Sequence, residues 1–502
     1  MNAMHPSNST SLAHILSGGS GTAPRRLHLR ASALLALASL GLGACAVGPS
    51  YRRKDPSAPS AWSAEATRTG VVDAGTRRDL SEWWRGLADP LLSELVQQAL
   101  QQGLDLRKAR ARLREARARR GVAGAERFPS VAATASASRA TSTAGTASTT
   151  GTQLSADIDA SWELDVFGGV RRGVEAAEAD LGTAQAGVDD AQVTLVAEVA
   201  RSYVEVRSLQ TRLGIARTNL ANQTETLQLT EYRAQAGLVS IQDAEQARSN
   251  REQTLAQLPS LEGSLTEAEH RLDFLLGLTP GTLHERLSGA GSLPAVPAQV
   301  AVGIPADALR QRPDVRAAER KLAAETARVG VAEAARYPSF KLSGSIGLQS
   351  AAQSAGGTGT VLSLLGGITA PIFDAGRLQH QAEAQDAVRQ QAELAYQQTV
   401  LAALQEAEDA VSALARARER GEALTRAAEA ARTAEGLARQ RYGAGVIDFQ
   451  AVIDTERTLL TVEDDLAGAR TDEVLALIRL YKALGGGWSR ETDRRVASRS
   501  TP

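Results

Sequence analysis

Cysteine, methionine, histidine and aromatic residues are all scarce in this chain of 502 residues. Its one cysteine has no partner, so no disulfide can form within the chain. Aromatic residues make up only 4% of the sequence, while alanine, leucine, glutamine, glutamate and arginine fill long stretches without proline. This composition is typical of extended helices and argues against a compact globular core.

Neither the charges nor the apolar runs indicate a nucleic-acid partner or a membrane-spanning helix. Acidic and basic residues number 57 and 56 and are interspersed. The dense run of arginines from Arg107 to Arg120 also contains acidic residues, as a solvated helix face does. Beyond the N-terminal region, no segment holds the roughly 18 consecutive apolar residues that a transmembrane helix needs.

The sequence shows no group of residues in a pattern that indicates a catalytic or metal-binding site. Both methionines precede Cys45, and after it only His270, His284 and His380 remain, far apart in sequence. This pattern indicates neither a histidine-containing catalytic triad nor a zinc cluster, and it removes a thioether relay for copper or silver. The chain also lacks a nucleotide-binding loop of the GxxxxGK type. We therefore expect a protein that is not an enzyme and holds no metal.

The first 44 residues have the pattern of a secretory signal. An apolar run at 31–43, too short to span a bilayer as a helix, follows Arg25, Arg26 and Arg30. It leads into Leu-Gly-Ala-Cys, which resembles the bacterial lipobox, where the signal is cut before the cysteine and the thiol is acylated. We expect Cys45 to carry a covalent lipid, a diacylglycerol and an N-acyl chain, that anchors the chain to a membrane. An unused thiol is the alternative.

The two halves of the chain repeat one pattern. Residues 121–130 read GVAGAERFPS and residues 330–339 read GVAEAARYPS, and the segments before the two motifs match in register. Further on, Gly237 corresponds to Gly445. Such duplication is the signature of an architecture built from stacked or ringed units, and it argues against a single catalytic pocket.

The duplication divides the chain into repeats and connections. The expected segments are a signal peptide at 1–44, a lipid-anchored tether at 45–88, a first repeat at 89–277, a linker at 278–304, a second repeat at 305–484 and a tail at 485–502. Each repeat is expected to contain a helix, then a β-hairpin at 129–165 or 338–373, then a long helical hairpin at 168–277 or 376–484.

The period of the apolar residues changes to two after Pro129. In the returning strand, leucine, isoleucine, alanine and tryptophan alternate with polar residues that include Asp157, Asp159, Glu163 and Asp165. Strands of roughly ten residues with this alternation are what a transmembrane β-barrel needs, although a half-buried strand in a soluble sheet alternates in the same way. Four strands are fewer than the roughly eight that close a barrel, so a membrane interpretation requires several copies of the chain.

Four aromatic residues stand where the predicted strands meet the helices: Phe128, Phe167, Tyr337 and Phe373. These positions suit an aromatic belt at a membrane boundary. Ordinary packing at a junction is the alternative for each of them.

Long helices follow each predicted β-hairpin. Residues 168–236 contain no proline and, as a helix, could reach roughly 100 Å. We expect Gly237 to end this helix and Ser240 to cap the next one. In the second repeat, Gly445 marks the break and Asp448 is the expected N-cap. The alanine, leucine and valine stripes favour helical hairpins that pack side by side in a coiled-coil manner.

Several motifs resemble the outer-membrane efflux protein family, the TolC-like channels, and within it the lipoprotein subgroup similar to OprM and NodT. They are CAVGPSY from Cys45, WWRGLADPLLSELVQQAL from Trp83, VGIPADALRQRPDVRAAER from Val302 and YKALGGGW from Tyr481. The resemblance covers nearly the whole chain after Cys45, and the duplicated strand and helix plan is itself a trait of the family.

The resemblance implies a mainly α fold with a transmembrane β-barrel portion. Three copies would each give four strands to a barrel of about twelve strands in the outer membrane, and their coiled helical hairpins would form a periplasmic tunnel. The implied partners are outer-membrane lipid, a periplasmic adaptor and an inner-membrane pump of the resistance-nodulation-division class. The chain itself would be a passive conduit for small molecules.

The resemblance also implies roles for individual residues. The hairpin tips, with Gly237, Ser240 and Gly445, would contact the adaptor and form the closed periplasmic gate. Asp448 would contribute a ring of carboxylates at the constriction, where like charges repel and can bind cations. A plain N-cap is the alternative for Asp448. If the alternation is read correctly, Asp157, Asp159, Glu163 and Asp165 line the barrel lumen.

Two other functions compete with small-molecule efflux. The chain could be the outer channel of a type I protein secretion system, whose pore would look the same. It could instead be a structural periplasmic lipoprotein without a pore, although the alternating strands and their duplication speak against such a spacer. The sequence does not name the cargo, because a passive tunnel needs no selective pocket.

Overall fold

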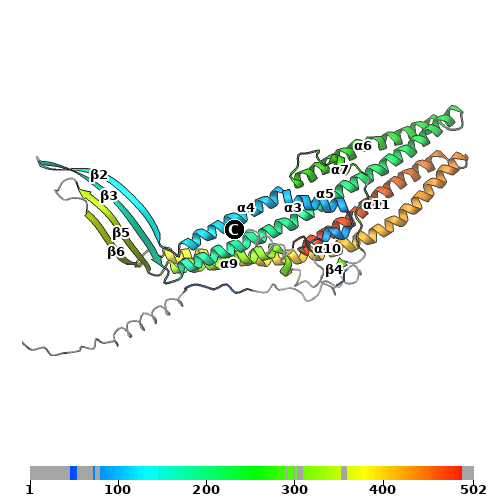
Figure 1. Cartoon of the computed structure of the whole chain (residues 1–502). Coiled ribbons are helices and arrows are strands. Elements are labelled where there is room, and N and C mark those ends of the chain that lie inside the picture. The colour runs from blue at the N-terminus through cyan, green and yellow to red at the C-terminus, as the bar shows by residue number, and fades with distance from the viewer. Residues whose placement is uncertain are drawn as a thin grey trace, which may run out of the picture.

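The computed structural model describes residues 46–53, 72–73, 80–145, 147–289, 291–297, 300–301, 309–351 and 359–488. The molecule is elongated, with a curved β-sheet at one end and two long helical hairpins that reach the other (Figure 1). The signal peptide, Cys45, most of the expected tether and most of the expected C-terminal tail lie outside the described residues.

The described strands form one four-stranded sheet and one short parallel pair. The strands β2 (Ser130–Ala144), β3 (Ala147–Leu164), β5 (Ser339–Ala351) and β6 (Gly359–Thr369) pair antiparallel in the order β2-β3-β5-β6. The two hairpins therefore join through β3 and β5, where Ile158 pairs with Ile346. Strands β1 (Val72–Asp73) and β4 (Val300–Ala301) pair in parallel elsewhere. Within the described residues, β2 and β6 are sheet edges that pair on one side only.

The strand register gathers the apolar side chains on one face of the sheet. Ile158 lies between Ala133 on β2 and Ile346 on β5, and Ile346 pairs in turn with Leu362 on β6. Leu362 is 79% exposed, so this face is uncovered in the single chain. The residues between these positions on each strand point to the other face. On β2, β3 and β5 most of them are polar, whereas β6 also places Val361 and Leu365 there.

The helices account for most of the chain. They are η1 (Trp83–Leu87), α3 (Pro90–Gln102), α4 (Leu104–Ala125), α5 (Gly169–Gln235), α6 (Ile241–Leu276), α7 (His284–Leu287), α9 (Pro313–Ala334), α10 (Arg377–Gly443) and α11 (Phe449–Ala483). Helices α5 and α10 have 67 residues each, and they form hairpins with α6 and α11 (Figure 1). Among the described helices, none combines the length and apolar character needed to cross a membrane.

The main core lies midway along the molecule, where η1 and α3 pack against the two hairpins. Leu92, Leu95, Leu272 and Leu477 are fully buried there. Trp83 stacks on Tyr481 with the ring centroids 5.0 Å apart. Alanine and leucine stripes allow the long helices to approach closely at this level, as the sequence predicts.

A polar seam joins the two hairpins closer to their tips. The Thr226 hydroxyl on α5 donates a hydrogen bond to Glu456 Oε1 on α11 at 2.7 Å, and Glu456 is only 3% exposed. Burial raises the pKa of Glu456, and the nearby Glu435 on α10 raises it further, whereas Thr226 and Arg439 lower it. Arg439 also pairs with Glu435 and with Glu225 of α5. The packed hairpins therefore favour a protonated Glu456 more than the separated hairpins do.

The seam should consequently weaken as pH rises. A carboxyl whose pKa is raised by packing stabilises the packed state below its ordinary pKa, and this contribution is lost as pH rises through the raised value. We expect amide protection in the first turns of α11, corrected for intrinsic exchange, to fall between mildly acidic and mildly alkaline pH. Glu456→Gln should keep the protection high across this range, and the exposed Glu429→Gln should behave like the wild type. Equal protection in Glu456→Gln and wild type at alkaline pH would contradict this account.

Candidate functional site

The polar face of the sheet is the first candidate site. Asp157, Asp159 and Glu163 lie on β3 on the face opposite Ile158, as the alternation predicts. Thr134 on β2 donates a hydrogen bond to Asp159 Oδ2 at 3.2 Å. Gly347 on β5 leaves room for the Asp157 carboxylate, because a Cβ at Gly347 would overlap it. This face is a wettable wall that carries negative charge.

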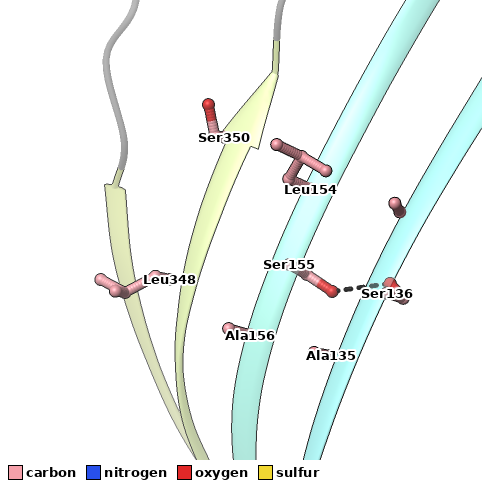
Figure 2. A pocket seen from close by; sticks show the side chains of 8 residues that line it. Ala135, Ser136, Leu154, Ser155, Ala156, Leu348 and Ser350 are labelled. Carbon is pink, nitrogen blue, oxygen red and sulfur yellow. Dashed lines mark hydrogen bonds between the residues drawn. The ribbon is translucent and has the colours of Figure 1, made fainter.

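A hollow in the outer half of the sheet lies mainly on the apolar face, the face that carries Ile158. Figure 2 shows the hollow across β2, β3 and β5, where Ser136 and Ser155 share a hydrogen bond of 2.8 Å. Its volume is about 390 Å³, and alanine, serine and leucine line it. Alanine and leucine supply most of its lining, and none of the lining residues is charged.

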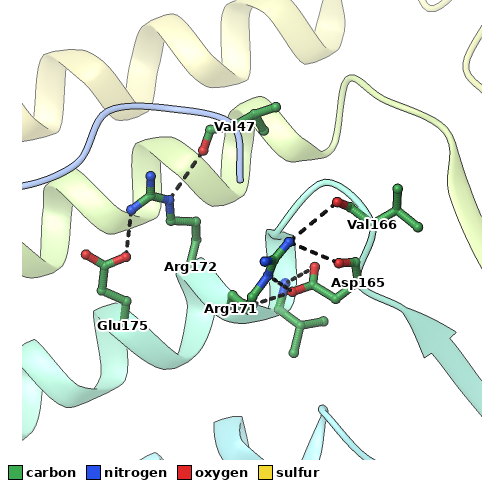
Figure 3. Close-up of polar contacts among 7 residues, drawn as sticks. Val47, Asp165, Val166, Arg171, Arg172 and Glu175 are labelled. Atoms are coloured by element: carbon green, nitrogen blue, oxygen red, sulfur yellow. Dashed lines mark hydrogen bonds and ion pairs between the residues drawn. The ribbon is translucent and has the colours of Figure 1, made fainter. Parts of the chain in front are cut away.

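Asp165 does not belong to this wall, so its predicted position in the lumen is wrong. It follows the last residue of β3, and its carboxylate accepts hydrogen bonds from the Val170 and Arg171 amides at 3.0 and 2.8 Å. The Arg171 side chain folds back onto the same carboxylate at 3.1 Å (Figure 3). Asp165 therefore binds the free amides at the start of α5. Asp374 does the same for α10, with Leu378 N at 2.9 Å.

The aromatic residues at the junction divide into two kinds. Phe167 stacks on Tyr337 with the centroids 4.7 Å apart, so these two pack the junction between the repeats. Phe128 and Phe373 are 70% and 90% exposed. In the single chain this second pair is therefore the more exposed one, although Tyr337 is also 42% exposed.

The hairpin tips form the second candidate site. Gly237 and Gly445 have φ of 75° and 72°, a backbone conformation that glycine adopts without strain. Ser240 begins α6 with a complete capping box, in which Ser240 and Asp243 bond each other's amides. Apolar side chains next to the two glycines remain exposed: Leu238 at 69%, Ile241 at 76% and Val446 at 71%. Each tip is thus a rigid turn that presents apolar surface.

Asp448 is the N-cap of α11, as one of its two predicted roles requires. Its Oδ1 accepts a hydrogen bond from Ala451 N at 3.1 Å, and its side chain is exposed at the tip. The capping bond leaves the second carboxylate oxygen open. The predicted gate role concerns a ring of several copies, and it stays a prediction.

Sequence reasoning missed the contact that holds the two tips together. Arg233 on α5 donates a hydrogen bond to the Tyr442 carbonyl at 2.6 Å, and its guanidinium lies 4.6 Å from the centre of the Tyr442 ring. The Tyr442 ring also packs against Phe449, the first residue of α11. The two partners are more than 200 residues apart in sequence, and no local pattern marks the pair.

The described residues contain no arrangement suited to a metal ion. No group of three or more histidine, cysteine, aspartate or glutamate side chains comes together among them. His284 pairs with Glu269 at 2.8 Å, and this carboxylate raises the pKa of His284. His380 pairs with Glu383 on its own helix.

Known proteins are similar in sequence to this chain over about nine tenths of its length. The outer membrane efflux protein family matches residues 95–278 and 304–486. The chain is 34% identical to the pyoverdine export outer membrane protein OpmQ of Pseudomonas aeruginosa over 92% of this chain and 98% of that protein. It is 32% identical to nodulation protein T of Rhizobium leguminosarum bv. trifolii over 90% of this chain and 96% of that protein.

Solved structures agree with the fold. The outer-membrane channel OprN superposes with a TM-score of 0.82 at 37% identity, over 88% of this chain and all of that one. The open state of the Neisseria gonorrhoeae MtrE outer membrane channel gives a TM-score of 0.75 at 26% identity, over 89% of this chain and 99% of that one. The family match spans both repeats, including the wall and the tips described above. The chain therefore belongs to the outer membrane efflux protein family and is the outer-membrane channel component of a tripartite efflux pump.

Proposed function

We propose that three copies of the chain close one pore through which small molecules leave the cell passively. A periplasmic adaptor would bind the hairpin tips, and an inner-membrane pump would supply the cargo and the energy. The observation that carries this proposal is the sheet, which has one uncovered apolar face, one acidic face and two edges that lack a second partner within the described residues.

The sheet edges require other copies if the sheet stands in lipid. Backbone groups that lack partners cost several kcal/mol each in hydrocarbon, so only closed barrels of strands span membranes. Four strands cannot close a barrel, but three equivalent sets can, with β6 of one copy beside β2 of the next. The apolar face would then meet lipid, and Asp157, Asp159 and Glu163 would line the water-filled lumen.

The two repeats differ in a way that supports the same arrangement. Helix α9 lies between α5 and α10, and Ala327 on it is 1% exposed. Its counterpart α4 packs on α5 with only Leu106 and Ala109 buried, and Ala118, which corresponds to Ala327, is exposed. A neighbouring copy could supply the missing α10, whose free surface includes Leu394 and Leu401 at 63% and 66% exposure. The ring would bury these surfaces.

The relatives support a small-molecule cargo. OpmQ is named for pyoverdine export, and TtgC of Pseudomonas putida, 31% identical to this chain, is named for toluene efflux. Within the described strands, the wall presents serine, threonine and carboxylate groups that are spread along the strands. Selection of the cargo would therefore take place in the pump.

A deletion strain tests the export function. Cells that lack the gene should become several-fold more sensitive to some dyes, detergents or antibiotics, and the intact gene should restore resistance, because the blocked conduit retains its cargo. The measurement is the minimal inhibitory concentration across these classes and metal salts, beside a screen of the secreted proteins. A normal sensitivity profile together with the loss of one secreted protein would replace efflux with secretion.

The charge and the capping bond of Asp448 can be separated by two variants. Asn is a good N-cap without charge, so Asp448→Asn should keep the tip folded and change only the proposed carboxylate ring. Asp448→Ala should also cost roughly 1 kcal/mol of helix stability. We expect Asp448→Asn to raise single-channel conductance in planar bilayers and to reduce its cation dependence. Conductance equal to wild type in Asp448→Asn, with a change in Asp448→Ala, would leave Asp448 with the capping role alone.

Acylation of Cys45 is the remaining part of the proposal. A lipid chain contributes about 0.8 kcal/mol of membrane affinity per buried methylene, and two or more chains give stable attachment. Cys45→Ser should abolish incorporation of radioactive palmitate, and the N-terminal peptide of the variant should carry no acyl groups in its mass spectrum. Continued labelling of the Cys45→Ser protein would contradict the lipid at this position.

A further inference from the structure

The residues that directly follow Cys45 lie across the junction between the two repeats. Val47 N donates a hydrogen bond to the Phe167 carbonyl at 3.1 Å, just beyond the end of β3. Six residues later, Arg53 pairs with Glu319 on α9 at 3.6 Å. We call residues 46–53 the strap. The sequence predicts an irregular tether here, and the strap has no helix or strand, but it is bonded to both repeats.

The second half of the strap is held by α9. The Tyr51 hydroxyl donates a hydrogen bond to Glu319 Oε1 at 3.2 Å, and its ring packs against Ala179 of α5 and Ala323 of α9. Burial and the neighbouring Glu319 carboxylate raise the pKa of Tyr51 well above its usual range, so the hydroxyl keeps its proton and remains a donor. This half of the strap lies in the groove between the two helices.

Arg172 on α5 holds the first half. Its Nε donates to the Val47 carbonyl at 3.3 Å (Figure 3). Its Nη2 donates to the Gly48 carbonyl at 3.3 Å and to Ser50 Oγ at 3.0 Å. Its Nη1 pairs with Glu175 at 2.7 Å, which balances the charge. Arg172 is 7% exposed, and hydrogen bonds from a charged donor are the stronger kind in such a place.

Two glycines allow the strap and the Arg172 side chain to lie close to α9. A Cβ on Gly48, whose φ is +86°, would lie 2.5 Å from Gly330 Cα on α9. A Cβ on Gly330 would lie 2.9 Å from Arg172 Cγ. Any side chain at either position would push the strap or the arginine away.

In the described part of the second repeat, no equivalent set of contacts is present. Gly168 and Gly376 precede α5 and α10, so His380 stands where Arg172 does, and it is exposed and bonded only along its own helix, to Glu383 at 2.9 Å. Gly121, the counterpart of Gly330, has nothing within 4 Å of an added Cβ. The duplication therefore supplies a natural control for each strap contact.

We propose that Arg172 is the positioning residue for the lipid anchor, and that it fixes the strap so that acyl chains on Cys45 enter the lipid surface beside the base of the sheet. Cys45 is one peptide bond from Ala46, so whatever holds Ala46 and Val47 limits where its acyl chains can go. This role rests on the acylation proposed above. The strap contacts themselves do not depend on it.

Limited trypsin digestion of the full-length protein in isolated membranes tests the proposal. Arg52 and Arg53 in the strap are exposed, so trypsin reports how often this backbone leaves its groove. Arg172→Met keeps the stem and removes every donor, and it should raise the rate of strap cleavage at least about tenfold. His380→Met should leave the rate unchanged. Arg172→Lys, which restores a cation with fewer donors, should give an intermediate rate.

Gly330→Ala and Gly121→Ala provide a second pair in case Arg172→Met folds poorly. Gly330→Ala should accelerate strap cleavage and Gly121→Ala should not, while cleavage within the long helices stays at the wild-type rate in both. Strap cleavage in a folded Arg172→Met protein at the wild-type rate would overturn the role of Arg172. Equal acceleration by Arg172→Met and His380→Met would overturn it as well.

The mass of the N-terminal peptide that trypsin cuts off, extracted from the membranes with organic solvent, separates this proposal from the acylation on which it rests. An acylated peptide that is cut off faster from Arg172→Met than from wild type is the expected result. An unmodified Cys45 in a well-protected strap would overturn both the lipid and its positioning, whereas an acylated Cys45 with no difference between the variants would overturn Arg172 alone.

Discussion

The rest of the structure depends on one constraint, the need to pair the backbone of β2 and β6. Each of these strands has a neighbour on one side only within the described sheet. In water such an edge is tolerable. The exposed apolar face with Leu362 and Leu364 suits a lipid environment, however, and in lipid an open strand edge is too costly. Closure by further copies, as proposed, would satisfy the backbone, cover the free surface of α4 and leave one acidic, water-filled bore. On this proposal, pore formation and assembly are the same event.

Duplication gives the ring its near symmetry, and the differences between the repeats give it its fixed features. Asp165 and Asp374 cap α5 and α10 alike, so the geometry where strand turns into helix is shared. Arg172 and His380 differ, so only the groove between α5 and α9 holds the strap. At the far end, Arg233 joins the first tip to Tyr442 of the second. The Arg233 contact joins the two repeats directly, and the Arg172 contacts join the first repeat to the strap, which also bonds to α9 of the second.

Local patterns in the sequence predicted much of this molecule. Gly237 and Gly445 mark the hairpin turns, and Ser240 and Asp448 cap the helices after them, because each preference depends on backbone geometry within a few residues. The alternation along β3 places Asp157, Asp159 and Glu163 on one face. The same alternation gives the wrong position for Asp165. The strand has ended there, and the carboxylate binds the free amides at the start of α5, an interaction that a period of two does not predict. The strap, the Arg233 contact and the Glu456 seam were not predictable, because they join residues that only the tertiary fold brings together.

The most direct test of the central claim is single-particle electron microscopy of the full-length protein in lipid nanodiscs. The account predicts three copies around one axis, with β6 of each copy paired to β2 of the next, the Leu362 face toward lipid and the Asp157 face toward the bore. A sheet whose β2 and β6 edges stay open, or that pairs with another protein in place of a second copy of this chain, would contradict it.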